Sequence, residues 1–174
     1  MTAAQMRRAA LATVLLSALS AQAGYLRVTL SDNNTRLTLT KTGGVNVLAP
    51  AFAEQVGFSE VKLSADGKHV GWLALFPNCC TSYPIALKLV VLDDAGRLHT
   101  FDGEKLAIFD WCFVPTRRAV AFRQGVLHGT DAQHFELRRI EDDHRMAQYD
   151  YPHDEQRQAH ARSRAPRWLR CVPE

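Results

Sequence analysis

Two histidines and one aspartate lie close together in the stretch HGTDAQH, which runs from His128 to His134. Its small and polar residues favour a turn, so that His128 would face His134 across a hairpin with Asp131 at the tip. Two imidazoles and a carboxylate could bind zinc, and a histidine oriented by an acid could transfer protons. The spacing matches no recognised motif, and we favour the alternative of a polar loop whose histidines bond to backbone or water. His128, Asp131 and His134 are therefore weak metal candidates, and no cofactor is predicted.

The chain has four cysteines, at Cys79, Cys80, Cys112 and Cys171. A bond between the neighbours Cys79 and Cys80 needs an uncommon strained ring, and adjacent residues of an extended chain point to opposite sides. We therefore predict that Cys79 and Cys80 each bond to a different partner, Cys112 or Cys171, in either order. The alternative is a vicinal pair that binds soft metals or exchanges with thiols, but no C-x-x-C spacing or nearby histidine supports it.

Established catalytic motifs do not occur in the sequence. It contains no G-x-S-x-G, no H-E-x-x-H, no P-loop and no G-x-G-x-x-G. Several aromatic residues at alternating positions could form a sugar-stacking platform, but in strands such positions usually belong to the core, and we expect burial. They are Trp72, Phe76, Phe109, Trp111, Phe113 and Phe122. The sequence thus predicts a protein that is not an enzyme.

Residues 1–23 have the three parts of a secretory signal peptide. Arg7 and Arg8 are followed by an apolar core from Ala9 to Leu19 and by the small-x-small site Ala21-Gln22-Ala23. The apolar core is shorter than the ~20 residues of a membrane-spanning helix, so we expect cleavage rather than anchoring and no transmembrane segment afterwards. This predicts a periplasmic or secreted protein, in a compartment that permits disulfide bonds.

The charge of the expected mature chain is close to neutral. Removal of residues 1–23 takes away two arginines and no acids, which leaves 19 basic against 18 acidic side chains. Such a balance gives no broad electrostatic surface for nucleic acid, so we predict no nucleic-acid partner. Residues 24–151 are long enough for one domain with a proper core.

Strand patterns extend through this domain. YLRVTL (25–30) and RLTLT (36–40) alternate around the turn-forming SDNNT, which predicts a hairpin. We expect further strands at 61–63, 69–76, 85–92, 97–101, 108–114, 119–123, 135–140 and 145–149, with turns between them. The fold class is therefore all-β, an antiparallel meander of about ten strands.

The two halves of this meander resemble each other. LSADGKHVGW (63–72) matches FVPTRRAVAF (113–122) in type at five of ten positions, and LDDAGRLHTF (92–101) matches IEDDHRMAQY (140–149) at six of ten. The offsets are 50 and 48 residues, so the units differ by two residues in the cysteine loop, where insertions are tolerated. We predict two four-stranded repeat units, at about 58–101 and 108–149.

The turn Ser64-Ala65-Asp66-Gly67-Lys68, followed by Val70-Gly71-Trp72, resembles the TolB-like β-propeller repeat, whose units carry a Ser-Pro-Asp-Gly-Lys turn before an apolar strand that ends in an aromatic residue. Ala65 replaces the proline, and the second unit keeps only Arg118-Ala119-Val120-Ala121-Phe122. The resemblance covers about 90 residues, 58–149. It implies blade-like sheets that serve as interaction scaffolds.

The chain is too short for a closed propeller, because a ring needs at least ~4 blades. Two blade-like units packed as a sandwich, with residues 25–40 as edge strands, are favoured over a partial propeller that several chains complete into a ring. An oligomer thus remains an alternative. The basic tail, 152–174, contains five arginines and predicts a short exposed helix or an irregular arm, pinned only if Cys171 is bridged.

Two classes of function follow from these patterns. The favoured one is an exported, non-catalytic β-repeat module that binds an unknown protein or glycan in the periplasm or outside the cell. The alternative is a small periplasmic metal- or thiol-dependent enzyme that uses His128, Asp131 and His134 or the Cys79-Cys80 pair.

Overall fold

The protein is an all-β stack of three antiparallel sheets. The computed structural model describes residues 24–79, 82–104, 107–127, 133–151 and 164–172. Within these residues the strands are β1 (Tyr25–Ser31), β2 (Arg36–Lys41), β3 (Asn46–Leu48), β4 (Gly57–Leu63), β5 (His69–Phe76), β6 (Ile85–Asp93), β7 (Leu98–Asp102), β8 (Ala107–Val114), β9 (Ala119–Gly125), β10 (Gln133–Arg139) and β11 (Arg145–Tyr151). Two short 3-10 helices are η1 (Pro115–Arg117) and η2 (Arg167–Cys171).

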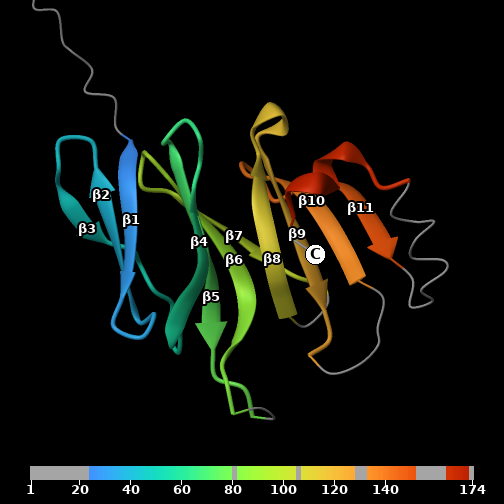
Figure 1. The fold of residues 1–174 in the computed structure, drawn as a ribbon, viewed down its shortest axis with the longest axis horizontal. Coiled ribbons are helices and arrows are strands. Elements are labelled where there is room, and N and C mark those ends of the chain that lie inside the picture. Colours follow the sequence, from blue (N-terminus) through green and yellow to red (C-terminus); the bar gives the residue numbers. More distant parts are fainter. Residues whose placement is uncertain (1–23, 80–81, 105–106, 128–132, 152–163, 173–174) are drawn as a thin grey trace, which may run out of the picture.

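The strands pair in sequence order within each sheet. The first sheet is β1-β2-β3, the second is β4-β5-β6-β7 and the third is β8-β9-β10-β11. Figure 1 shows the three sheets side by side, with the second between the other two. The two predicted four-stranded repeat units are therefore the second and third sheets, and the all-β meander is confirmed.

We expected the N-terminal hairpin to add edge strands to a sandwich, and this prediction was wrong. The hairpin forms a separate sheet with β3, and its inward side chains Leu37 and Leu39 pack on Val70 and Trp72 of the second sheet. Alternation in 25–40 correctly predicted one buried face, because every second residue of a strand points to the same side. It could not show whether that face meets a sheet edge or a sheet face.

The opposite face of the second sheet packs against the third. Leu73, Leu89 and Val91 share a core with Trp111 and Phe122. Trp111 lies directly on Gly71, where a Cβ atom would come 2.4 Å from the indole Cη2 atom. The indole Nε1 donates a hydrogen bond to the Glu60 carbonyl oxygen, 2.8 Å away.

Both repeat units are oriented in the same sense in the stack. Val70 and Trp72 of the second sheet face the first sheet, and the equivalent Val120 and Phe122 of the third sheet face the second. The second and third sheets therefore each present the same face to the preceding sheet, rather than meeting through identical faces.

The outer face of the third sheet is covered by η2. Trp168, Leu169 and Val172 pack on Phe135 and Leu137 of β10. Trp168, whose environment the sequence did not indicate, is buried. The C-terminal segment is thus packed on the domain in its described part, 164–172.

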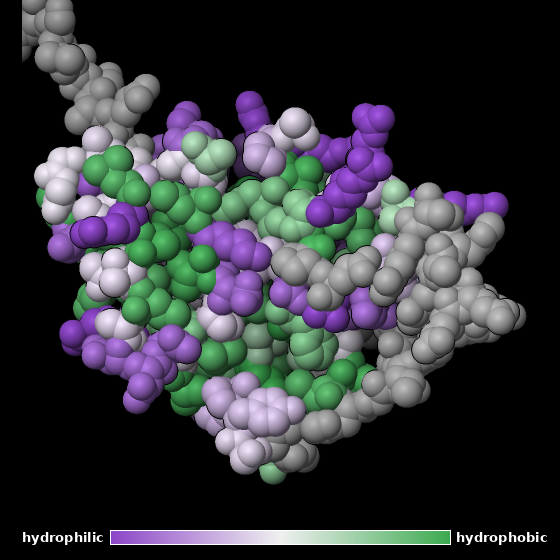
Figure 2. Space-filling view, viewed as in Figure 1, coloured by the Kyte–Doolittle hydropathy of each residue, from purple (hydrophilic) through white to green (hydrophobic). Residues whose placement is uncertain are grey.

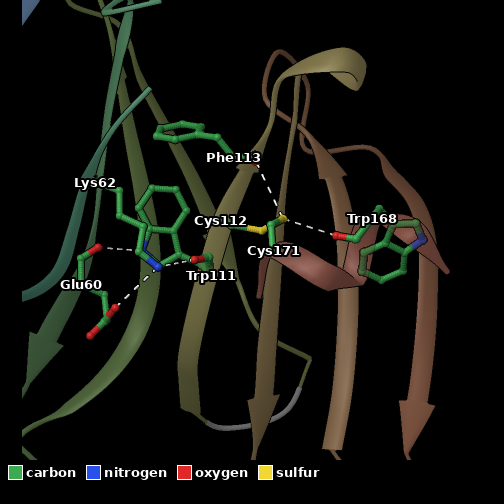
Figure 3. The surroundings of a disulfide bond; sticks show 7 residues. All are labelled: Glu60, Lys62, Trp111, Cys112, Phe113, Trp168 and Cys171. Carbon is green, nitrogen blue, oxygen red and sulfur yellow. Dashed lines mark hydrogen bonds and ion pairs between the residues drawn. A yellow bond between two sulfur atoms is a disulfide. The ribbon is translucent and has the colours of Figure 1, made fainter. Parts of the chain in front are cut away.

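A disulfide joins Cys112 of β8 to Cys171 of η2 (Figure 3). Our prediction that these two cysteines bond to Cys79 and Cys80 was therefore wrong. Cys112 points to the outer face of the third sheet, and the C-terminal segment returns over that face and brings Cys171 to it. As expected for a bridged Cys171, the end of the tail is pinned.

Two of the segments discussed above lie outside the described residues. They are the predicted signal peptide, 1–23, and residues 152–163 of the tail. Within the part that the structure describes, no helix has the length and apolar character needed to cross a membrane.

Candidate functional site

The histidine at the end of the HGTDAQH motif lies in a buried polar cluster. His134 and Glu136 are two residues apart on β10 and therefore project from the same face, toward the second sheet. Phe135 and Leu137 point to the other face, under η2. His134 is 5% exposed and Glu136 is fully buried. The other two metal candidates, His128 and Asp131, lie outside the described residues.

Both ring nitrogens of His134 face carboxylates. Nδ1 lies 2.5 Å from Oδ1 of Asp150, on the neighbouring strand β11, and Nε2 lies 3.1 Å from Oε1 of Glu136. A neutral imidazole carries one proton and can donate to only one of them. The other nitrogen and its facing oxygen both present lone pairs, so a positive charge, either a proton or a metal ion, is needed between them.

Two arginines balance part of the negative charge around Glu136. Arg138 donates through Nε to Oε2 of Glu136 and through Nη1 to both carboxylate oxygens of Asp143. Nη1 of Arg145 lies 3.9 Å from Oε1 of Glu136. Burial lowers the pKa of Arg138, but these two carboxylates outweigh that effect and leave its pKa above the ordinary value. Burial raises the pKa of Asp143 above its ordinary value, although the contact with Arg138 opposes this. The network is thus partly desolvated.

The connection between the second and third sheets contributes one further carboxylate. Glu104 follows the end of β7 and is exposed, and Arg145 of β11 donates a hydrogen bond to it. One ligand atom each of Glu104, His134 and Glu136 lies within 4.8 Å of the others. We call Glu104, His134, Glu136 and Asp150 the carboxylate–histidine cluster. It spans the boundary between the second and third sheets.

Of this cluster, the sequence singles out only His134. Alternation gave no signal for Glu136, since it groups this residue with His134 and Arg138 on the polar side of the strand, opposite Phe135 and Leu137, which is typical of a face exposed to solvent. No signal pointed to Glu104 either, because it lies thirty positions before His134, in the connection between β7 and β8, and only the tertiary fold brings it to the site.

A second region with binding character lies at one end of the second sheet, where the β5–β6 hairpin turns. Two cavities of about 260 and 600 Å³ adjoin there and share Val56 and Pro77 in their walls. Their other lining residues are Asn78, Ser82, Tyr83 and Pro84 in the smaller, and Glu54, Gln55, Phe76 and Leu87 in the larger. We call these ten residues the loop-end surface.

Large side chains are exposed on the loop-end surface. Tyr83 is 50% exposed and Val56 is 44% exposed. Figure 2 shows hydrophobic residues reaching the surface over the second sheet and toward this lower end of the molecule. Cys79 is exposed in the same hairpin, and Cys80 lies outside the described residues, so the thiol-based alternative remains a prediction.

The predicted aromatic core is confirmed in most positions. Trp72, Trp111 and Phe122 are fully buried, and Phe113 and Phe76 pack against the cores. Phe109 is an exception, because it is 37% exposed on β8, where the guanidinium of Arg123 lies over its ring. A bulge between Ile108 and Asp110 shifts the register there, which alternation could not reveal.

Comparison with known proteins gives no independent guide to function, because the chain matches no family model, no curated protein and no solved structure. Function is therefore inferred from the geometry of the two regions above.

Proposed function

We propose that the chain is an exported, non-catalytic β-repeat module that binds a protein partner through the loop-end surface. The observation that carries this proposal is the pair of adjoining cavities beside exposed Tyr83 and Val56. Exposed apolar and aromatic side chains around concave surface are typical of interaction sites, where their burial against a partner supplies the driving force.

A protein partner fits this surface better than a glycan. Its apolar residues are Val56, Phe76, Pro77, Pro84 and Leu87, its polar residues are Glu54, Gln55, Asn78 and Ser82, and Tyr83 is the one aromatic residue among its exposed side chains. One exposed ring offers little area for the stacking that sugars need. Apolar residues beside an exposed tyrosine instead resemble the centre of a protein interface.

The fold supports such a role by holding the surface on a rigid frame. Phe76 pairs with Ile85 at the last rung of β5 and β6, so the hairpin begins where the packed sheet ends. Val56 donates its backbone N–H to the Leu75 carbonyl oxygen, 2.8 Å away, which fastens the other wall of the cavities to the same strand. A preformed surface loses less conformational entropy on binding.

Export is supported by two separate features. Residues 1–23 carry the pattern of a signal peptide, and the Cys112–Cys171 disulfide suits an oxidising compartment. The resemblance to TolB-like repeats, together with the same-sense stacking of the two units, supports an interaction scaffold rather than an enzyme.

The test is capture of partners from a cell-envelope fraction on immobilised mature protein. Wild type is compared with the double variant Val56→Ser/Tyr83→Ala, and with Leu98→Ser, a matched control at an exposed apolar position on β7. We expect one protein to be retained by wild type and by Leu98→Ser and lost from the double variant. Equal retention by all three would overturn the proposed site, and retention of a glycan alone would overturn the proposed partner class.

A further inference from the structure

The geometry points to a divalent-metal site, best suited to Zn²⁺, in which Glu104, His134 and Glu136 are the protein ligands. This inference concerns a different part of the molecule from the loop-end surface. Glu104 lies in the connection between β7 and β8, and His134 and Glu136 lie on β10 of the third sheet. A bound ion would therefore fasten the connection between the two repeat units to the third sheet.

The distance between the first two donor atoms suits a common metal ion. Zinc–nitrogen and zinc–carboxylate bonds are ~2.0–2.2 Å long. Two such bonds that meet at an angle between a right angle and the tetrahedral angle separate their donor atoms by roughly 3.0–3.5 Å. Nε2 of His134 and Oε1 of Glu136 are 3.1 Å apart. These two atoms can therefore coordinate one ion without a change in the strand.

Asp150 prepares His134 for this role. Its carboxylate faces Nδ1 at 2.5 Å and can accept the ring proton there. The proton then resides on Nδ1, and Nε2 presents its lone pair toward Glu136. Metal-binding histidines commonly have this arrangement, in which a carboxylate behind the ring fixes the tautomer and the orientation.

The oxygens of Glu136 are divided between two cations. Oε2 accepts the hydrogen bond from Arg138, and the other oxygen, Oε1, faces Nε2 of His134. The nearest guanidinium nitrogen of Arg145 lies 3.9 Å from Oε1 and also contacts Glu104. Arg145 thus sits at the place of a metal ion, and its 41% exposed side chain is free to swing into solvent when an ion binds.

The charge around the site also favours a cation. Four carboxylates and two guanidinium groups are connected through this network, namely Glu104, Glu136, Asp143, Asp150, Arg138 and Arg145. With a neutral His134 the network carries a net charge of about −2, and one divalent ion would balance it. The two buried ligands then gain the compensation that burial of a charge requires.

The experiment is calorimetric titration of zinc chloride into mature, disulfide-bonded protein that has been treated with a chelator and dialysed. The variants Glu104→Gln and Asp150→Asn change exposed carboxylates, so the fold is kept. The matched control is Asp142→Asn, an exposed carboxylate on the neighbouring turn that pairs with Arg139. Arg145→Gln removes the competing guanidinium group.

We expect one zinc ion per wild-type chain. Affinity should fall by roughly 10–100-fold in Asp150→Asn and at least as much in Glu104→Gln, stay unchanged in Asp142→Asn, and rise in Arg145→Gln. Zinc should also raise the midpoint of thermal unfolding in wild type and much less in Glu104→Gln, because only the native state brings the β7–β8 connection and β10 together.

Three outcomes would overturn the site. These are no stoichiometric zinc binding, unchanged affinity in both Glu104→Gln and Asp150→Asn, and loss of zinc in His128→Ala/Asp131→Asn or Cys79→Ser while Glu104→Gln binds normally. The Val56→Ser/Tyr83→Ala variant should bind zinc as wild type does, so failure of the partner proposal leaves this test intact.

Discussion

Gly71 shows how one residue sets the distance between the two repeat units. The indole of Trp111 covers it so closely that a Cβ atom would lie 2.4 and 2.9 Å from two ring carbons. Lys62 lies over the other part of the ring, 5.2 Å from its centroid, and donates to the Trp111 carbonyl oxygen (Figure 3). The ring is therefore held between the sheets and has little room to move.

Gly71→Ala should destabilise the protein by about 1–3 kcal/mol, because the added methyl group must push Trp111 out of a packed interface. Gly125→Ala is the control, since its Cβ atom would meet Phe109 at an ordinary 3.6 Å. We expect the control to be neutral or up to about 1 kcal/mol more stable. Urea unfolding measures both, and equal stability of the two variants would contradict this account of Gly71.

Asp93 gives the protein a predictable dependence on acid. Burial raises its pKa, but hydrogen bonds from Arg97 and His99 outweigh burial and leave the pKa below the ordinary value. The stability that the ionised carboxylate contributes is therefore fully present above about pH 4, the pKa of an unfolded aspartate. It is lost as the pH falls through the lower pKa of the folded state.

Asp93→Asn should accordingly lose less stability than wild type between pH 6 and pH 3, although it is less stable at pH 6 because the buried turn has lost a charged acceptor. Asp94→Asn, in the same turn, should follow wild type. Urea unfolding at the two pH values is the measurement. A drop in Asp93→Asn as large as that of wild type would show that other groups govern the acid response.

At this scale the sequence predicted burial better than chemistry. The apolar runs in 69–76 and 119–123 were enough to place Trp72 and Phe122 in the core, and both faces of β5 and β9 are buried there. The sequence pattern did not indicate the partners of His134. Glu136 lies on the same strand, but Asp150 comes from β11 and Glu104 from the connection between β7 and β8, and such long-range contacts have no local pattern.

The element that the sequence described least well is the C-terminal segment. It contains a short 3-10 helix, η2, which lays Trp168 and Leu169 on the outer face of the third sheet and places Cys171 beside Cys112. The bond closes a loop with a sequence separation of 59. Without this cover, Phe135 and Leu137 would face water.

Removal of the bond in Cys112→Ala/Cys171→Ala should destabilise the protein by about 4 kcal/mol in the chain-entropy model, within a usual range of about 2–5. Thermal unfolding of wild type with and without a reductant gives the same comparison. The double variant should not respond to the reductant. A wild type whose unfolding midpoint is unchanged by reduction would show that η2 packs without the bond.

Strand positions were predictable at the element scale, and their partners were not. The expected strand 69–76 matches β5, because a long apolar run between turns leaves few alternatives. The strand β3 was missed, since three residues are too short to show alternation. The disulfide pairing was wrong for a different reason, namely that separation in sequence does not tell which sheet face a returning tail covers.

At the scale of the whole molecule, the two ends of the stack differ. On the first sheet, Thr29, Thr38 and Thr40 point outward, and Leu48, which pairs with Thr38 on the same face, is 62% exposed. On the third sheet, η2 covers the apolar face. Polar or covered ends are what terminal units of a repeat stack require in water. We predict that neither end binds another copy of the chain.

We propose that one chain forms the whole stack by itself and presents the loop-end surface to a different protein. Light scattering of the purified mature protein, combined with size-exclusion chromatography, tests it most directly. We predict the mass of a single chain across a wide range of concentration. A stable mass of two or more chains would contradict the claim, because the stack would then be one part of a ring that several copies complete.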